Sequence, residues 1–311
     1  MSKFDYLLDK INNAKFSTEP FSHLLIEDFL SDEHFEQIVS SSQLNKTKFS
    51  DTRKMLECFL DDGFEIATFP GCIKSVDDYV EFIDGGMKKV KNRLIEGYGK
   101  GVILSYGMAI GIKEHKHKST ENLVNFVKSS KFKSCLESKF KISRRNYIDT
   151  NIQKYFSGYE ISPHPDARRK ALTYMLNINT DVASEKIQMH TKLMTFKDRY
   201  KYIYDLWKYN DDIDRCWVPW EWCNYHSHTF KNNSIIIFAP SYNTLHSIKL
   251  DYDHLSFQRT QLYGNLWYEE KLAHKSSIAD IDIPSRHEFN NSLTLKNKIM
   301  KKTIDSIYKF K

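Results

Sequence analysis

One short motif in the sequence combines two side chains that can bind a metal ion. His164 and Asp166 are separated by a single residue within the segment SPHPD. In an extended chain, side chains two residues apart point to the same face, so this imidazole and carboxylate can hold one ion. A third potential ligand, His246, follows the apolar run SIIIFAP. The His164–Asp166 pair alone is weak evidence for a metal site, because this spacing arises by chance in a chain with 12 histidines. The alternative is that the segment is a solvated turn.

Two histidines and one carboxylate on β-strands make the facial triad of non-haem Fe(II) oxygenases, which leaves coordination positions open. Arg259 comes 13 residues after His246. A permanently charged guanidinium inside a barrel is costly unless it meets an anion, and a dicarboxylate cosubstrate would supply one. These four residues therefore predict a complete site.

The elements that must position these residues lie in a strand-rich second half. After Ile148 the chain shows short apolar runs broken by polar turns, which is typical of a sandwich or barrel. The runs are NIQKYFSGYEI, ALTYMLNIN, KLMTF, SIIIFAP, HSIKLDY and RTQLYGNLWY. Lys197 to Trp207 interrupts them with a possible helix.

The first half of the chain is predicted to be rich in helices that support the strand-rich half. Ser31 and Ser75 each precede a helical pattern as N-cap, with acidic residues in the first turn. The segment from Thr120 to Lys139 carries apolar residues at helical spacing.

Composition narrows the class of protein. The 311 residues are 41% hydrophobic and 28% charged, as in folded globular proteins. No apolar run is long enough to cross a membrane, and the N-terminus lacks a secretory pattern, so we expect a cytoplasmic protein without a membrane partner. Five scattered cysteines argue against a disulfide framework. A net charge of +6 is too mild for a dedicated nucleic-acid binder.

The residues resemble those of the 2-oxoglutarate and Fe(II)-dependent oxygenases, specifically the prolyl-4-hydroxylase-like branch. PFSHLLIEDFL with the following helix is similar to that branch's entry, and YFSGYEISPHPDARRKALTYMLNIN is similar to its first metal-binding strand. SIIIFAPSYNTLHSIKL and QRTQLYGNLWY resemble the strands with the distal histidine and the cosubstrate arginine. The resemblance covers roughly residues 20–268.

The resemblance implies roles for particular residues. His164, Asp166 and His246 would bind Fe(II), and Arg259 would bind the distal carboxylate of 2-oxoglutarate. Tyr155 would donate a hydrogen bond to the same carboxylate or simply be a core aromatic residue. Gln261 stands where family patterns often have serine, so a second anchor for the cosubstrate is not identified.

The resemblance also implies the reaction. 2-Oxoglutarate and O2 would be consumed, succinate and CO2 released, and a substrate hydroxylated, with no catalytic residue beyond the iron ligands. Asp166 disfavours halogenation, because related halogenases have a small residue there. Asn265 stands where the DNA-repair branch carries a second arginine, which disfavours alkyl-base repair.

We therefore expect a mainly β protein with flanking helices, built on a double-stranded β-helix (jelly roll, cupin-like) core. A single oxygenase domain would span 1–311, with helical support over 1–147, the core over 148–270, an insertion at about 181–232 and a helical extension over 271–311. The substrate would be an amino acid, peptide or small metabolite. The alternative is a catalytically silent jelly roll that binds a ligand or protein.

The tryptophan-rich part of the insertion is expected to pack over the barrel mouth as a lid. Arg168, Arg169 and Lys170 directly follow the metal motif. They would either meet an anionic substrate at the entrance or form a solvated turn. The oligomeric state does not follow from the sequence.

Overall fold

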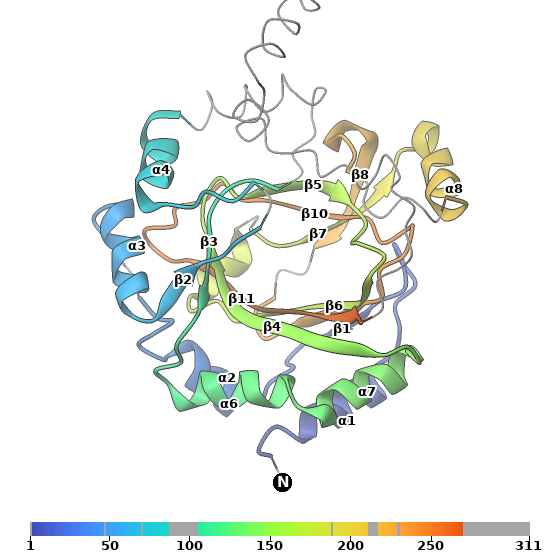
Figure 1. Cartoon of the computed structure of the whole chain (residues 1–311), viewed down its shortest axis with the longest axis horizontal. Helices are drawn as coiled ribbons and strands as arrows, with labels where there is room; N and C mark the ends of the chain where they lie inside the picture. Colours follow the sequence, from blue (N-terminus) through green and yellow to red (C-terminus); the bar gives the residue numbers. More distant parts are fainter. Residues whose placement is uncertain are drawn as a thin grey trace, which may run out of the picture.

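Two antiparallel β-sheets face one another and helices cover one of them (Figure 1). The computed structural model describes residues 2–46, 48–69, 71–86, 105–187, 189–210, 217–228 and 231–269. The predicted helical extension over 271–311 lies outside these residues.

The larger sheet has seven strands and contains three of the longest apolar runs of the sequence. Their order across the sheet is β1 (Leu24–Ile26), β9 (Ile235–Phe238), β6 (Lys170–Asn177), β11 (Arg259–Tyr268), β4 (Asn146–Tyr155), β3 (Ala109–Ile112) and β2 (Phe64–Ile66). The smaller sheet has four strands, in the order β5 (Glu160–His164), β10 (His246–Lys249), β7 (Lys192–Phe196) and β8 (Cys223–His228).

The path of the chain between the sheets identifies the fold. From β4 to β11 successive strands alternate between the larger and the smaller sheet. The one exception is β7 and β8, which are consecutive and both belong to the smaller sheet. Eight antiparallel strands connected in this way form a jelly roll, which has two Greek keys. The prediction of a mainly β protein with a double-stranded β-helix core is confirmed.

The helices are short, and the two predicted N-caps, Ser31 and Ser75, are present. They are α1 (Tyr6–Asn13), α2 (Asp32–Val39), α3 (Thr52–Asp61), α4 (Val76–Glu81), α6 (Lys118–Val127), α7 (Ser130–Phe140) and α8 (Tyr202–Lys208), with a π-helical turn η1 (Phe82–Gly86) and 3₁₀ turns η2 (Val182–Lys186), η3 (Asp198–Tyr200) and η4 (Trp220–Trp222). Ser31 accepts a hydrogen bond from His34 N, and Ser75 accepts one from Asp78 N. These bonds satisfy amide groups that a helix leaves unpaired at its N-terminus.

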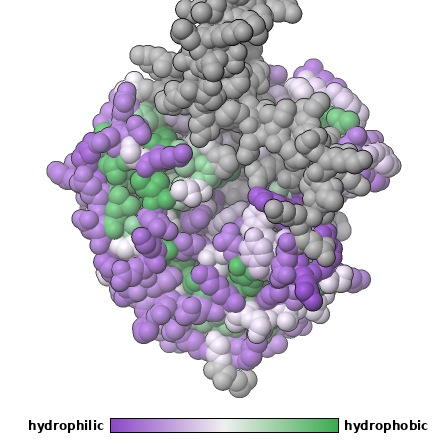
Figure 2. Space-filling view, viewed as in Figure 1, coloured by the Kyte–Doolittle hydropathy of each residue, from purple (hydrophilic) through white to green (hydrophobic). Residues whose placement is uncertain are grey.

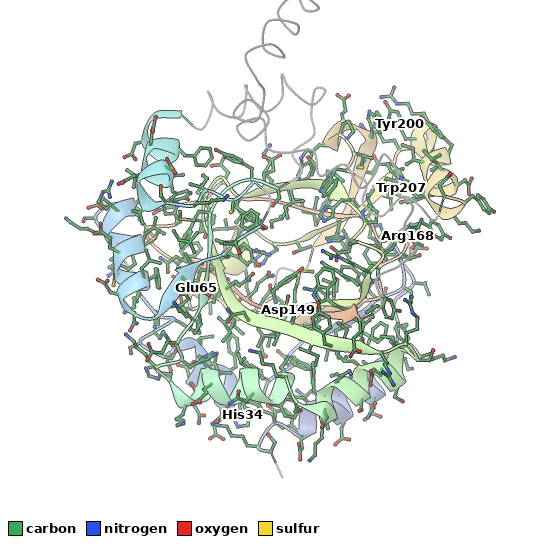
Figure 3. The ribbon with its side chains drawn as sticks, viewed as in Figure 1. His34, Glu65, Asp149, Arg168, Tyr200 and Trp207 are labelled. Carbon is green, nitrogen blue, oxygen red and sulfur yellow. The ribbon has the colours of Figure 1, made fainter. Side chains whose placement is uncertain are left out.

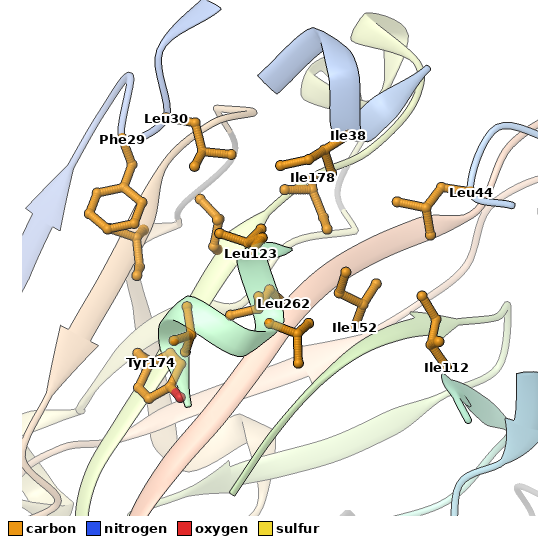
Figure 4. Packing of buried hydrophobic residues seen from close by; sticks show 14 of the residues in the cluster. Phe29, Leu30, Ile38, Leu44, Ile112, Leu123, Ile152, Tyr174, Ile178 and Leu262 are labelled. Atoms are coloured by element: carbon orange, nitrogen blue, oxygen red, sulfur yellow. The ribbon is translucent and has the colours of Figure 1, made fainter. Parts of the chain in front are cut away.

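The main hydrophobic core lies between the larger sheet and the helices that cover it. Figure 1 shows α1, α2, α6 and α7 beneath this sheet. Ile152, Tyr174 and Leu262 project from the sheet into the core, where Leu123 and Ile38 meet them from the helices (Figure 4). Since side chains alternate along a strand, the other face of the same strands points between the two sheets.

A glycine allows one large side chain to pack closely. A Cβ on Gly264 of β11 would lie 2.3 Å from the ring of Tyr174 on the neighbouring strand, closer than atoms can approach. Tyr174 is fully buried in the core. The absence of a side chain at Gly264 therefore lets the tyrosine ring lie across β11.

The structure adds detail to two of the expected segments. The segment Thr120–Lys139 forms two helices, because the chain leaves the helix after Val127 and Ser129 caps a new one. The region 181–232 is not a simple insertion, because β7 and β8 within it are strands of the smaller sheet. β8 is a polar edge strand, CNYHSH, which lacks the apolar alternation that would predict it.

The surface agrees with the composition. The visible rim of the described residues is mostly hydrophilic, with smaller hydrophobic areas between (Figure 2). Among the described residues, no helix has the length and apolar character needed to span a membrane.

Candidate functional site

A cavity of about 380 Å³ lies between the two sheets and is lined by all five residues that the sequence analysis assigned to the metal and the cosubstrate. His164 and His246 come from the smaller sheet, and Arg259 and Tyr155 come from the larger one. Asp166 follows β5 in the loop that leads to β6. The two sheets thus bring residues that are up to 104 positions apart in the sequence into one space.

The three predicted metal ligands meet at one point. His164 and His246 are direct partners across β5 and β10, and their ring centroids are 4.5 Å apart. One ligand atom from each imidazole and one from the Asp166 carboxylate all lie within 4.8 Å of one another. Within the described part of the chain, this is the one group of three or more such side chains.

The backbone fixes both imidazole rings in the orientation that metal binding needs. His164 Nδ1 lies 2.8 Å from the carbonyl oxygen of Ser162, and His246 Nδ1 lies 2.9 Å from that of Thr244. Because a carbonyl oxygen only accepts hydrogen bonds, Nδ1 carries the proton in each ring and Nε2 keeps its lone pair. Burial lowers the pKa of His164 to about 3 and also lowers that of His246, so both rings are neutral.

The Asp166 carboxylate is held on both oxygens. Lys170 Nζ donates to Oδ1 at 2.8 Å, and Thr173 Oγ1 donates to Oδ2 at 2.5 Å. Burial raises the pKa of Asp166, but the charge and the hydrogen bond of Lys170 outweigh it and leave the pKa below its usual value. Burial lowers the pKa of Lys170, and the Asp166 charge more than compensates. The carboxylate therefore stays ionised, with lone pairs left for a metal.

Two neutral imidazoles and one carboxylate within this distance are the donor set of a facial triad. Asp166 Oδ2 lies 3.9 Å from His246 Nε2, and both side chains are 9% exposed. The orientations of these three side chains therefore fit a facial-triad iron site.

Arg259 is a buried cation without an anionic partner in the described structure. The residue is 2% exposed. Its Nη2 donates to Thr191 Oγ1 at 3.3 Å, and its guanidinium lies 4.7 Å from the ring centroid of Tyr155. Its Nε is buried without a hydrogen-bond partner, and burial lowers its pKa. An unpaired buried charge is costly, and an anion at this end of the cavity would lower that cost.

Tyr155 contacts the arginine with its ring and uses its hydroxyl elsewhere. The Tyr155 hydroxyl donates to Gln153 Oε1 at 2.5 Å. Burial raises the pKa of Tyr155 well above its usual value, so the hydroxyl remains a donor. Gln261 is buried, and its Nε2 donates to Asn177 Oδ1 at 2.7 Å. The wall around Arg259 is therefore a network of neutral polar side chains.

The tryptophan-rich segment reaches the cavity through Trp217, which lines it and lies over the His164 ring with centroids 6.1 Å apart. Trp207 packs in a separate buried cluster. Arg168, which was predicted to meet a substrate or solvent, instead donates to the backbone carbonyl oxygens of Trp207 and Asn210 (Figure 3). Arg168 thus ties the metal-motif loop to this segment.

Sequence analysis missed several residues of the cavity. Thr173 and Thr191 contact Asp166 and Arg259, respectively. Thr173 is a polar residue inside the apolar run ALTYMLNIN, and this is a signal that could have found it. Asp149 and Trp267 line the end of the cavity that is farther from Arg259. Their positions depend on the register of β4 and β11, which the sequence does not give.

No protein-family model matches the chain. No curated protein matches it in sequence either. Among solved structures, the chain is similar to a Pseudomonas putida prolyl-4-hydroxylase, with 8% identity over 86% of this chain and 100% of that one and a TM-score of 0.42.

Two further structures are similar at the same low level of identity. A Trichoplax adhaerens prolyl hydroxylase, solved with a hypoxia-inducible-factor peptide, is 10% identical over 88% of this chain and 93% of that one, with a TM-score of 0.39. The non-haem α-ketoglutarate-dependent epimerase SnoN of nogalamycin biosynthesis is 10% identical over 85% of this chain and 80% of that one, with a TM-score of 0.35. The order of the strands in the two sheets identifies the jelly-roll fold by itself.

Proposed function

We propose that this protein is a non-haem Fe(II) and 2-oxoglutarate-dependent dioxygenase. It would hydroxylate an unactivated C–H bond of an amino acid, peptide or small metabolite, with release of succinate and CO2. The observation that carries the proposal is the pair of features in one cavity: an oriented His-Asp-His triad and a buried arginine with no anionic partner among the described residues.

The triad supports a resident iron. His164, Asp166 and His246 would hold Fe(II) through two Nε2 atoms and one carboxylate oxygen. When bound, Fe(II) supplies the redox chemistry that activates O2 at its open coordination positions. The protein's own contribution is to keep both imidazoles neutral and correctly turned, through the Ser162 and Thr244 carbonyl groups.

The arginine supports a dicarboxylate cosubstrate. Arg259 presents a forked guanidinium that matches a carboxylate, and Thr191 holds one of its nitrogens in place. Burial strengthens the attraction of this cation for an anion, because water cannot screen it. 2-Oxoglutarate has a distal carboxylate for Arg259 and a 2-oxo acid group for the triad. A monocarboxylate cannot supply both groups.

A catalytically silent jelly roll that binds a ligand or protein is the alternative. Such a protein would need neither a triad with open positions nor an anion site inside the same cavity. Both features favour the enzyme.

The test is succinate formation from 2-oxoglutarate in air with Fe(II), without substrate and then with pools of amino acids, peptides and metabolites. Wild type should form succinate, and His164→Ala and Arg259→Ala should not. Lys249→Met is the control. Lys249 lies on the same sheet as His164, but its side chain is 47% exposed and forms an ion pair with Glu160, outside the triad. A wild-type protein that binds neither iron nor 2-oxoglutarate would support the silent jelly roll.

A further inference from the structure

One charged group that lines the cavity has no role in the function proposed above. Lys170 is paired with Asp166, and Arg259 is assigned to the cosubstrate. Asp149 of β4 also lines the cavity. It is exposed and has no hydrogen bond or ion pair with any described residue, so its charge faces the cavity without a partner.

The strand geometry places Asp149 inside the barrel. Gln153 and Tyr155 lie at the same parity on β4 and also line the cavity, whereas Ile152 faces the helical core. Figure 3 shows Asp149 between the two sheets. The carboxylate is therefore part of the cavity wall.

The register places Asp149 at the triad end of the cavity, far from Arg259. Asp149 is paired with Asn265 on β11, whereas Tyr155 is paired with Arg259. Six residues of a strand span about 20 Å. Asn265 in turn lies 3.2 Å from Thr173 Oγ1, which bonds the Asp166 carboxylate. Asp149 thus lies beside the hydrogen-bond partners of the metal ligand, where a substrate must bind.

We propose that Asp149 binds a protonated amine of the substrate, so that the substrate class is an organic ammonium compound. This inference rests on the proposed function, because it takes the space beside the triad as the substrate site. A carboxylate attracts an ammonium group by charge and accepts its hydrogen bonds. An anionic substrate would be repelled by Asp149, and the nearby cation Lys170 is already bonded to Asp166 and Tyr263.

The neighbouring residues suit the rest of such a molecule. Trp217 and Trp267 line the cavity and offer apolar surface to a carbon skeleton. Asn265 Oδ1 accepts from the Tyr263 hydroxyl at 3.2 Å, which orients the amide and leaves its NH2 group as a donor. An acceptor at Asp149 and a donor at Asn265, directly opposite each other, match an amine with an oxygen close by, as in an amino acid.

The test measures binding of simple probes to the metal-free protein by NMR titration at low ionic strength. The probes are n-butylammonium, n-butanol and butyrate, which have the same chain length and differ in charge. Wild type should bind butylammonium about tenfold more tightly than butanol, and butyrate most weakly at this site. Asp149→Asn should remove the preference and Asp149→Glu should keep it.

Glu65→Gln is the matched control, because it removes one negative charge at the edge strand β2, away from Asp149 (Figure 3). This variant should keep the preference for butylammonium. Equal binding of butylammonium and butanol to wild type would overturn the proposal, as would a preference that persists in Asp149→Asn.

Iron and 2-oxoglutarate binding to the wild type is measured in parallel. Failure of that binding would refute the oxygenase function but would not alter the probe result. A wild type that shows no preference for butylammonium, but binds iron and 2-oxoglutarate, would refute only the assignment of Asp149.

Discussion

The two faces of the larger sheet differ in chemistry although they belong to the same strands. On β11, Leu262 and Leu266 point toward the helices and are at most 1% exposed. On the same strand Arg259, Gln261 and Asn265 point between the sheets. On this strand the helix-facing side chains pack into the core, whereas the cavity-facing side chains from Arg259 to Asn265 are polar or charged.

This difference shows how one strand can serve stability and chemistry separately. Because the side-chain period is two, each face can carry its own residue types without disturbing the other. One charged residue departs from this separation: Lys154 of β4 points toward the helices and is fully buried. Its Nζ donates to Thr260 Oγ1 at 2.8 Å and lies 5.0 Å from the centroid of the Phe59 ring.

The largest effect is expected from removing a ligand on the cavity side. His246→Ala should lower Fe(II) or Mn(II) affinity by more than about 100-fold, since loss of a residue that only supports a ligand already costs about 10- to 100-fold. Metal titration monitored by calorimetry measures the change. An unchanged affinity would show that the triad is not the metal site.

A helix-side substitution should do the opposite and affect stability alone. Leu262→Ala should reduce the free energy of unfolding by about 2–5 kcal/mol, because it leaves a cavity in the core. Denaturant unfolding measures the loss, and Leu262→Met is the control with a loss below about 1.5 kcal/mol. Metal affinity that fell together with stability would contradict the separation of the two faces.

A smaller effect on metal binding is expected from Thr173→Val, which keeps the shape but removes the hydroxyl that bonds Asp166. Metal affinity should fall by about tenfold, at the lower end of what such supporting hydrogen bonds contribute. Thr173→Ser should restore most of the affinity. A Val variant with wild-type affinity would mean that Lys170 alone orients the carboxylate.

The last prediction concerns the charged exception on the helix side. Burial lowers the pKa of Lys154 to about 7, while the unfolded chain has the usual value near 10.5. Between these values the unfolded state binds more protons, so this residue makes stability rise with pH by up to about 1.4 kcal/mol per unit. Lys154→Met should flatten the curve from pH 7 to 10.5 and raise stability at pH 7. A curve of unchanged slope would show that Lys154 is not the cause.

The sequence predicts most of the strands and the three side chains that meet in the cavity because their signals are local. RTQLYGNLWY corresponds to the whole of β11, and Ser31 caps a helix as expected. The triad was accessible because its residue types are restricted by metal chemistry, and Arg259 because a buried guanidinium needs an anion.

The features that escaped prediction depend on pairing between distant strands. The polar strand β8 forms because β7 offers it backbone partners, and its own residues carry no apolar pattern. Asp149 gains its position only from its partner Asn265 on β11, more than 100 residues away. The break at Ser129 depends on a cap that competes with a continuous apolar spacing.

The central claim is that one cavity binds a metal at one place and a dicarboxylate cosubstrate at another. The most direct measurement is calorimetric titration of the Mn(II)-loaded protein with 2-oxoglutarate and with 2-oxobutyrate, which lacks the distal carboxylate. Wild type should strongly prefer 2-oxoglutarate, and Arg259→Met should bind the two ligands equally weakly. A wild-type protein without this preference, or a variant that keeps it, would contradict the account.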